Sequence, residues 1–91
     1  MAMHRQTVTI CNKLGMHARA AAKFVQMAAR YESDIKLQRG PREVNGKSIM
    51  GVMMLAAGKG TTFDIVAHGA DAEQAVANLV ELVAGRFGES E

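Results

Sequence analysis

The sequence has few aromatic residues: no tryptophan, one tyrosine and three phenylalanines make up 4% of its 91 residues. Hydrophobic residues nonetheless reach 48%, so Val, Leu, Ile, Met and Ala must build the core. A natural domain holds about 50 to 200 residues, and we therefore assign residues 1–91 to a single domain. A core of this size leaves no room for a deep substrate cleft, so any chemistry should take place on the surface.

Cysteine is also scarce, because Cys11 is the only one. A lone cysteine excludes an internal disulfide and gives no ligand pair for zinc, and His4 and His68 are expected to be ordinary surface residues. No metal or cofactor is therefore expected. The longest apolar run, from Ile49 to Ala57, is too short to span a membrane, and the N-terminal residues lack the apolar stretch of a signal peptide. We expect a cytoplasmic protein without membrane insertion.

Acidic residues are missing from residues 1–30, which carry five bases, whereas residues 60–91 carry six acids and Arg86 as their only base. This segregation predicts one electropositive region, suited to an anion or to an acidic protein surface. The net charge of +2 is too small to indicate nucleic acid. No aromatic residues lie among the bases to stack on nucleotides, so no nucleic-acid partner is expected.

The hydrophobic pattern predicts an order of β-α-β-β-α-β-α. Apolar and polar residues alternate in four predicted strands, around Thr7–Cys11, over Asp34–Arg39, over Arg42–Asn45 and over Thr61–His68. Helical spacing predicts helices from Ala18 to about Arg30, from Ser48 to about Ala57, and from Asp71 to Gly85 or Gly88. Asp71 and Gln74 have the spacing of a capping box. This order predicts an α+β fold with helices covering one face of the sheet.

His17 is the candidate for chemistry because a predicted helix begins directly after it. The first N–H groups of a helix have no internal partner, and they carry the positive end of the helix dipole. A phosphate on the imidazole would meet these donors, and Arg19 could bind its oxygens with a planar guanidinium. Composition alone leaves a plain alternative, in which His17 and Arg19 are ordinary surface residues at the start of a helix.

Two separate runs resemble one known family. Residues 14–23, Leu-Gly-Met-His-Ala-Arg-Ala-Ala-Ala-Lys, resemble the active-site segment of HPr, the histidine-containing phosphocarrier of the bacterial phosphoenolpyruvate-dependent phosphotransferase system. Residues 44–60, from Val44 to Gly60, resemble that family's serine-containing second helix and the loop after it. The resemblance covers nearly the whole chain. It implies an open-faced β-sandwich, in which three helices cover one face of a four-stranded antiparallel sheet.

The resemblance implies that His17 is phosphorylated at Nδ1 and that Arg19 is the active-site arginine. Enzyme I would be the phosphoryl donor and enzyme IIA-type proteins the acceptors, so the chain would be a carrier and not an enzyme. Family members usually have proline after the arginine, where this chain has Ala20. Alanine is an excellent helix former, so the local geometry is expected to persist.

Ser48 is the second candidate residue. A serine at this position commonly caps a helix, which is its plain structural interpretation. The resemblance implies that it is a regulatory site, phosphorylated from ATP by HPr kinase/phosphorylase. Gly46-Lys47-Ser48 also looks like the end of a P-loop, but that motif requires glycine where Pro41 stands. Nucleotide hydrolysis is therefore not expected.

The predicted helix after Ser48 carries more apolar residues than one buried stripe needs. We expect Val52 and Leu55 in the core, and Met16, Ile49, Met50 and Met53 on a partner-docking surface beside His17, since methionine-rich surfaces adapt to several partners. The alternative is that all of these residues belong to the core. Two other functions also stay open: a nitrogen-related regulatory carrier, and an interaction module that transfers no phosphate. The family expectation is a monomer.

Overall fold

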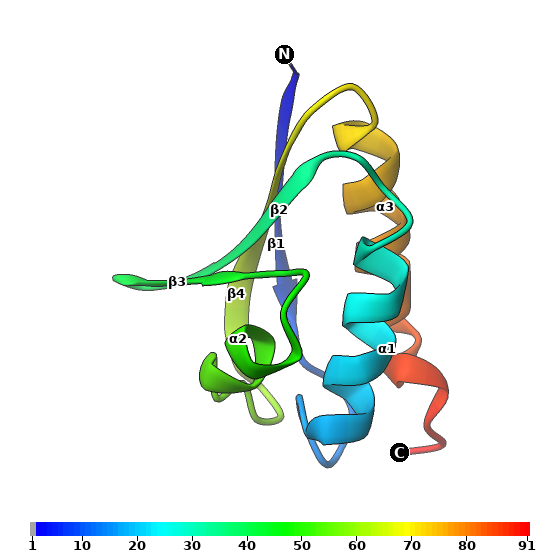
Figure 1. The fold of residues 1–91 in the computed structure, drawn as a ribbon. Helices are drawn as coiled ribbons and strands as arrows, with labels where there is room; N and C mark the ends of the chain where they lie inside the picture. Colours follow the sequence, from blue (N-terminus) through cyan, green and yellow to red (C-terminus); the bar gives the residue numbers. More distant parts are fainter. Residues whose placement is uncertain (1) are drawn as a thin grey trace.

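The computed structural model describes residues 2–91, and its fold is that of an open-faced β-sandwich (Figure 1). The strands are β1 (Met3–Thr9), β2 (Asp34–Arg39), β3 (Arg42–Asn45) and β4 (Thr62–His68). They form one antiparallel sheet in the order β1-β4-β2-β3. The helices are α1 (Ala18–Ala28), α2 (Ile49–Met54), α3 (Ala72–Ala84) and the single turn η1 (Arg86–Gly88). The predicted fold class and element order are confirmed.

The two faces of the sheet differ in polarity because side chains alternate along each strand. The face toward the helices is apolar, and its buried residues are Val8, Ile35, Leu37, Phe63, Ile65 and Ala67. The open face carries a polar network, in which Arg5 donates to Gln38 and to Asp64. Thr7 also donates to Asp64, and these bonds from Thr7 and Arg5 lower the pKa of the Asp64 carboxyl. One face is therefore the core and the other faces water.

Helices α1 and α3 lie side by side against the apolar face, and α2 packs near the end of the sheet where α1 begins (Figure 1). Ala20, Ala21 and Ala28 of α1 are fully buried, so small side chains let this helix approach its neighbours closely. Ala20 continues α1 without a break, as expected for alanine at the position of the family's proline. Within residues 2–91, none of the helices combines the length and the apolar character needed to cross a bilayer.

The element boundaries differ from the predictions at several ends. Strand β1 covers Met3–Thr9 and not the region up to Cys11, although Ile10 is buried as predicted. Helix α1 ends at Ala28, and α2 ends at Met54 and not near Ala57. Ala56 has a φ of 55°, a left-handed conformation that stops the helix before the predicted terminating glycine.

The predicted capping box at Asp71 is wrong. Asp71 precedes α3, but its side chain makes no capping bond to that helix. Its carboxylate instead accepts hydrogen bonds from the backbone N–H of Glu32, at 2.9 Å, and from Ser33. These bonds, led by the one from the Ser33 hydroxyl, lower the pKa of Asp71. The carboxylate thus joins the start of α3 to the loop before β2, a long-range contact that local spacing cannot reveal.

Candidate functional site

The loop before α1 is held in place by backbone contacts with the turn that follows α2. The N–H of Met16 donates to the carbonyl of Ala57 at 2.8 Å. Gly15 has a φ of 68° and lies so close to this turn that a Cβ on it would stand 2.7 Å from the oxygen of Ala57. The loop therefore presents the next residue, His17, at a defined position.

Met16 corrects one prediction. It was expected on the docking surface, but its side chain is 7% exposed and belongs to the core. The reason is its place in the loop, since its backbone is bonded to Ala57 and its side chain follows that backbone inward. Met16 therefore anchors the loop and cannot offer its side chain to a partner.

His17 is the residue that precedes α1, and its backbone is extended, with φ of −75° and ψ of 176°. Its carbonyl accepts the first helical hydrogen bond, from Ala21 at 2.8 Å. Helix geometry leaves the N–H groups of residues 18–20 without an acceptor inside the helix. The imidazole is 28% exposed. An accessible ring and unpaired helical amides thus lie together, as the sequence predicted.

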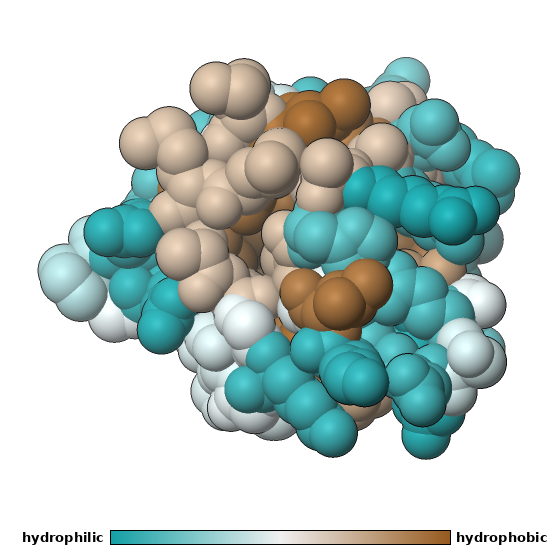
Figure 2. Space-filling view, turned by 90° about the horizontal axis from the view of Figure 1, so that it is seen from below, coloured by the Kyte–Doolittle hydropathy of each residue, from teal (hydrophilic) through white to brown (hydrophobic). Residues whose placement is uncertain are grey.

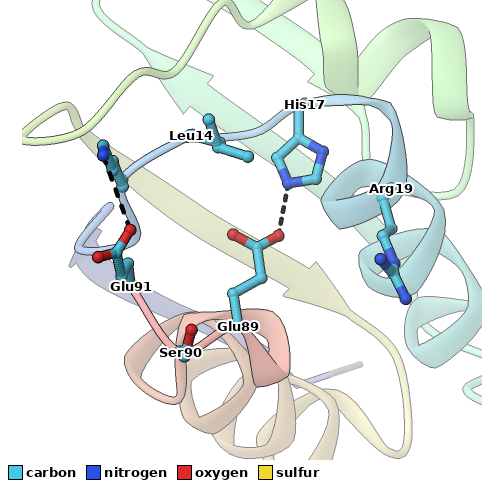
Figure 3. A pocket seen from close by; sticks show the side chains of 7 residues that line it. Leu14, His17, Arg19, Glu89, Ser90 and Glu91 are labelled. Atoms are coloured by element: carbon cyan, nitrogen blue, oxygen red, sulfur yellow. Dashed lines mark hydrogen bonds and ion pairs between the residues drawn. The ribbon is translucent and has the colours of Figure 1, made fainter.

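The imidazole makes one contact that the sequence did not predict. Its Nε2 lies 2.5 Å from Oε2 of Glu89, 72 residues further along the chain. Figure 3 shows that the other ring nitrogen, Nδ1, lies on the opposite side of the ring, toward the first turn of α1. The two ring nitrogens therefore face different surroundings: Nε2 faces a carboxylate and Nδ1 faces the positive end of a helix.

The C-terminal segment lies against the start of α1 (Figure 1), and hydrogen bonds hold it there. Lys23 donates to the carbonyl of Phe87 at 2.6 Å, and the N–H of Lys13 donates to the carbonyl of Glu91 at 3.0 Å. Asn12 donates its side-chain N–H to Oε1 of Glu89 at 3.0 Å. The bond from Asn12, and then the bond from His17, lower the pKa of the Glu89 carboxyl, so it is charged at neutral pH.

Arg19 lies at the same hollow but does not touch His17. The hollow has a volume of about 300 Å³ and is lined by Lys13, Leu14, His17, Arg19, Glu89, Ser90 and Glu91. The guanidinium of Arg19 is exposed and points away from the imidazole (Figure 3). The predicted convergence of the arginine on the histidine is therefore not present in this state, although both side chains line one cavity.

Apolar side chains gather beside the hollow on the end of the molecule shown in Figure 2. We call the exposed residues Leu14, Ile49, Met50, Met53 and Met54 the apolar patch. Met50 is 72% exposed, whereas Val52 and Leu55 on the opposite side of α2 are fully buried. Ile49, Met50 and Met53 thus face outward as expected. Leu14 and Met54 were not predicted to lie on this surface, although both belong to the segments that resemble the family.

Ser48 caps α2, as its plain interpretation predicts. Its hydroxyl oxygen accepts a hydrogen bond from the N–H of Gly51 at 3.1 Å, and its backbone is extended. The side chain is half-buried and directly precedes Ile49 of the apolar patch. A group added to this hydroxyl would therefore stand at the edge of the patch.

Glu89 is the functional candidate that sequence reasoning missed. It lies in a tail that has no strong pattern, and its partners Asn12 and His17 are more than 70 residues away. One signal was present, since the acidic C-terminal third complements the basic first third of the chain. That segregation predicted attraction between the two regions but could not select one carboxylate.

Comparison with known proteins agrees with this geometry. Residues 4–85 match the family model described as "PTS HPr component phosphorylation site". The chain is 51% identical to the phosphocarrier protein HPr of Cupriavidus necator, over 98% of this chain and 100% of that protein. It is 39% identical to the phosphocarrier protein NPr of Shewanella violacea, over 91% of each chain. The crystal structure of HPr-C-His from Thermoanaerobacter tengcongensis superposes with a TM-score of 0.93 at 42% identity, covering 97% of this chain and 99% of that one. The chain therefore belongs to the HPr family of phosphocarrier proteins of the phosphotransferase system.

Proposed function

We propose that this carrier accepts a phosphoryl group at Nδ1 of His17 from phosphorylated enzyme I and passes it to enzyme IIA-type proteins. One observation carries the choice of residue: His17 is the histidine whose accessible ring stands directly before a helix N-terminus, with Nδ1 facing the first turn of α1. His4 and His68 lie in strands β1 and β4, and neither of them directly precedes a helix.

The transfer step is an in-line displacement between two imidazoles. The lone pair on Nδ1 attacks phosphorus, the new N–P bond forms as the donor N–P bond breaks, and the electron pair of the broken bond returns to the donor nitrogen. Unpaired amides at the start of α1 offset negative charge on the phosphoryl oxygens. Arg19, which is exposed, turns toward the phosphoryl group and binds its oxygens.

The same step runs in reverse with an acceptor protein, so the carrier leaves each cycle unchanged and needs no substrate pocket of its own. The shallow hollow at His17 suits this role, because the attacking or leaving group belongs to a partner protein that covers the site. The higher identity to an HPr than to an NPr favours the sugar-type chain over the nitrogen-related one.

The proposal is tested by incubating the protein with enzyme I and phosphoenolpyruvate. We expect one phosphoryl group per chain, stable in alkali and lost in acid, and mass spectrometry should locate it on His17. Addition of an enzyme IIA-type protein should discharge it. An interaction module that transfers nothing would bind partners without acquiring label, and faster labelling by a nitrogen-type donor would favour the regulatory paralogue.

We also propose that the apolar patch docks these partners. Replacing Met50 by aspartate places a charge at its most exposed residue, and we expect kcat/KM for phosphorylation by enzyme I to fall about tenfold or more. Met3→Asp is the matched control, because Met3 is 52% exposed but lies on β1, outside the patch. Equal rates for the two variants would show that partners dock elsewhere.

We further propose that HPr kinase/phosphorylase modifies Ser48. A phosphate there adds a dianion next to Ile49. The start of α2 tolerates this charge, but the charge repels acidic groups of a partner and is costly to desolvate. Ser48→Asp is therefore expected to slow phosphorylation of His17 by about tenfold, whereas Ser48→Ala should lose only the cap, about 1 kcal/mol of stability.

The measurement compares labelling by the kinase with ATP and labelling by enzyme I, for both variants. Ser90→Ala is the control, and it should leave labelling by the kinase unchanged. Ser90 is exposed, but it lies in the C-terminal tail and caps no helix. Undiminished kinase labelling of Ser48→Ala would assign the modification to another residue.

A further inference from the structure

We propose that Glu89 is a positioning residue for phosphoryl transfer, which holds the imidazole of His17 in the tautomer with hydrogen on Nε2 and stabilises the positive charge that the ring acquires when Nδ1 is phosphorylated. The inference rests on the proposed function of His17. It concerns a carboxylate of the C-terminal tail, 72 residues from the histidine along the chain.

The tautomer follows from which atoms can donate. An ionised carboxylate is only an acceptor, so the 2.5 Å contact between Oε2 of Glu89 and Nε2 of His17 requires the hydrogen to be on Nε2. A neutral imidazole with hydrogen on Nε2 has its lone pair on Nδ1. That is the nitrogen facing the first turn of α1 (Figure 3), where the phosphoryl group would meet helical amides.

Asn12 orients the carboxylate. It is fully buried, and its side-chain N–H groups donate to the carbonyl of Gly15 at 2.8 Å and to Oε1 of Glu89 at 3.0 Å. Its own side-chain oxygen is buried and finds no partner within the described residues 2–91. An unpaired buried oxygen costs stability. Both partners of the amide are acceptors, so the amide is held in the orientation in which its two hydrogens face Gly15 and Glu89.

Glu89 therefore receives two donors, one on each oxygen. Asn12 cannot turn its amide without losing Gly15, so it always presents an N–H to residue 89. A glutamine at position 89 has a single acceptor oxygen, and that oxygen must face Asn12. Its NH2 group would then face His17 and require Nε2 to accept. The ring would move its hydrogen to Nδ1, and the nucleophilic lone pair would be lost.

The carboxylate also matters after attack. When Nδ1 bonds to phosphorus and the donor N–P bond breaks, the hydrogen stays on Nε2 and the ring becomes cationic. A carboxylate at hydrogen-bond distance stabilises this cation, as the aspartate of a serine-protease triad stabilises its imidazolium. In the reverse step the ring leaves with the N–P electron pair and becomes neutral again. No proton has to move in either direction.

Other charged side chains from neighbouring elements also surround the ring. Lys13 and Arg19 line the hollow on one side, and Glu91 lines it from the tail. The positive charge of Lys23 on α1 also lowers the pKa of the Glu89 carboxyl. Among these groups, Glu89 is the one in direct contact with the imidazole in the structure of residues 2–91.

The test compares the full-length variants Glu89→Gln and Glu89→Ala with the wild type. Nitrogen NMR of the His17 ring reports its tautomer and its titration, both with and without phosphate, and rapid-quench assays report the transfer rate from enzyme I. We expect Glu89→Gln to shift the hydrogen to Nδ1 more than Glu89→Ala, in which water can meet either nitrogen. Both should slow transfer about tenfold or more.

Glu81→Gln is the control, because Glu81 is an exposed glutamate on α3 that does not line the hollow. It should leave the tautomer and the rate unchanged. If Glu89→Gln keeps the wild-type tautomer, titration and rate, the inference is wrong and the proposed function stands. If the wild type accepts no phosphate, the proposed function fails, and the NMR comparison alone then decides whether Glu89 sets the tautomer.

Discussion

Replacing His17 by alanine should abolish acid-labile phosphorylation by enzyme I and phosphoenolpyruvate, with no residual label on the chain. In the proposed transfer the imidazole supplies the atom that bonds to phosphorus, so its removal leaves no acceptor. The fold should persist, because the side chain is partly exposed and makes no capping bond to α1. Circular dichroism and thermal unfolding check this, and mass spectrometry measures the label.

The other two histidines are the controls for this experiment. His68 is exposed at the end of β4, and His4 lies on β1 with its Nε2 3.7 Å from a carboxylate oxygen of Glu73. His4→Ala and His68→Ala should both accept one phosphoryl group at the wild-type rate. Label that survives in His17→Ala, or that disappears in either control, would move the site to another residue.

Replacing Gly15 by alanine should cost more stability than the same change at Gly40, and should also impair transfer. Gly15 and Gly40 have φ of 68° and 58°. An alanine in this region costs about 1–2 kcal/mol at either position. Only at Gly15 would the new Cβ meet backbone, 2.7 Å from the oxygen of Ala57 and 2.8 Å from Cα of Gly58. Relieving that overlap adds about 1–3 kcal/mol.

The overlap lies where the loop before α1 meets the turn after α2, so its relief displaces the loop that carries His17. We therefore expect Gly15→Ala to lose stability in urea unfolding and to accept phosphate more slowly, whereas Gly40→Ala loses stability alone. Because a Cβ on Gly40 meets nothing within 4 Å, that variant isolates the backbone term. Equal destabilisation of the two variants would show that the overlap at Gly15 is relieved without further loss of stability.

The elements of the fold could be predicted because their cause is local. Alternation in β2 and β4 and helical spacing in α1 and α3 depend on neighbouring residues, and the structure confirms those elements. The ends of α1 and α2 could not be placed from spacing alone. Helix α2 stops at Met54 because Ala56 adopts a left-handed conformation beside the turn that binds the loop before α1.

The exposure of the apolar residues was only partly predictable. An excess of apolar side chains in α2 indicated that some of them face water, and Met50 does so. Met16 precedes His17 in the same motif, but its backbone bond to Ala57 draws its side chain into the core. Met16 is thus buried, whereas the ring of the adjacent His17 is partly exposed. The cause is a contact with a part of the chain that is distant in sequence.

What the sequence determined by itself is the proposed acceptor and its helix, since His17 and the unpaired amides come from a few consecutive residues and need only local geometry. What the tertiary structure decided is the contact that the ring of that histidine makes. The carboxylate of Glu89 reaches Nε2 because Asn12, Lys13 and Lys23 hold the C-terminal tail against the start of α1. Contacts between residues so far apart arise from packing of the whole fold, and no local pattern encodes them.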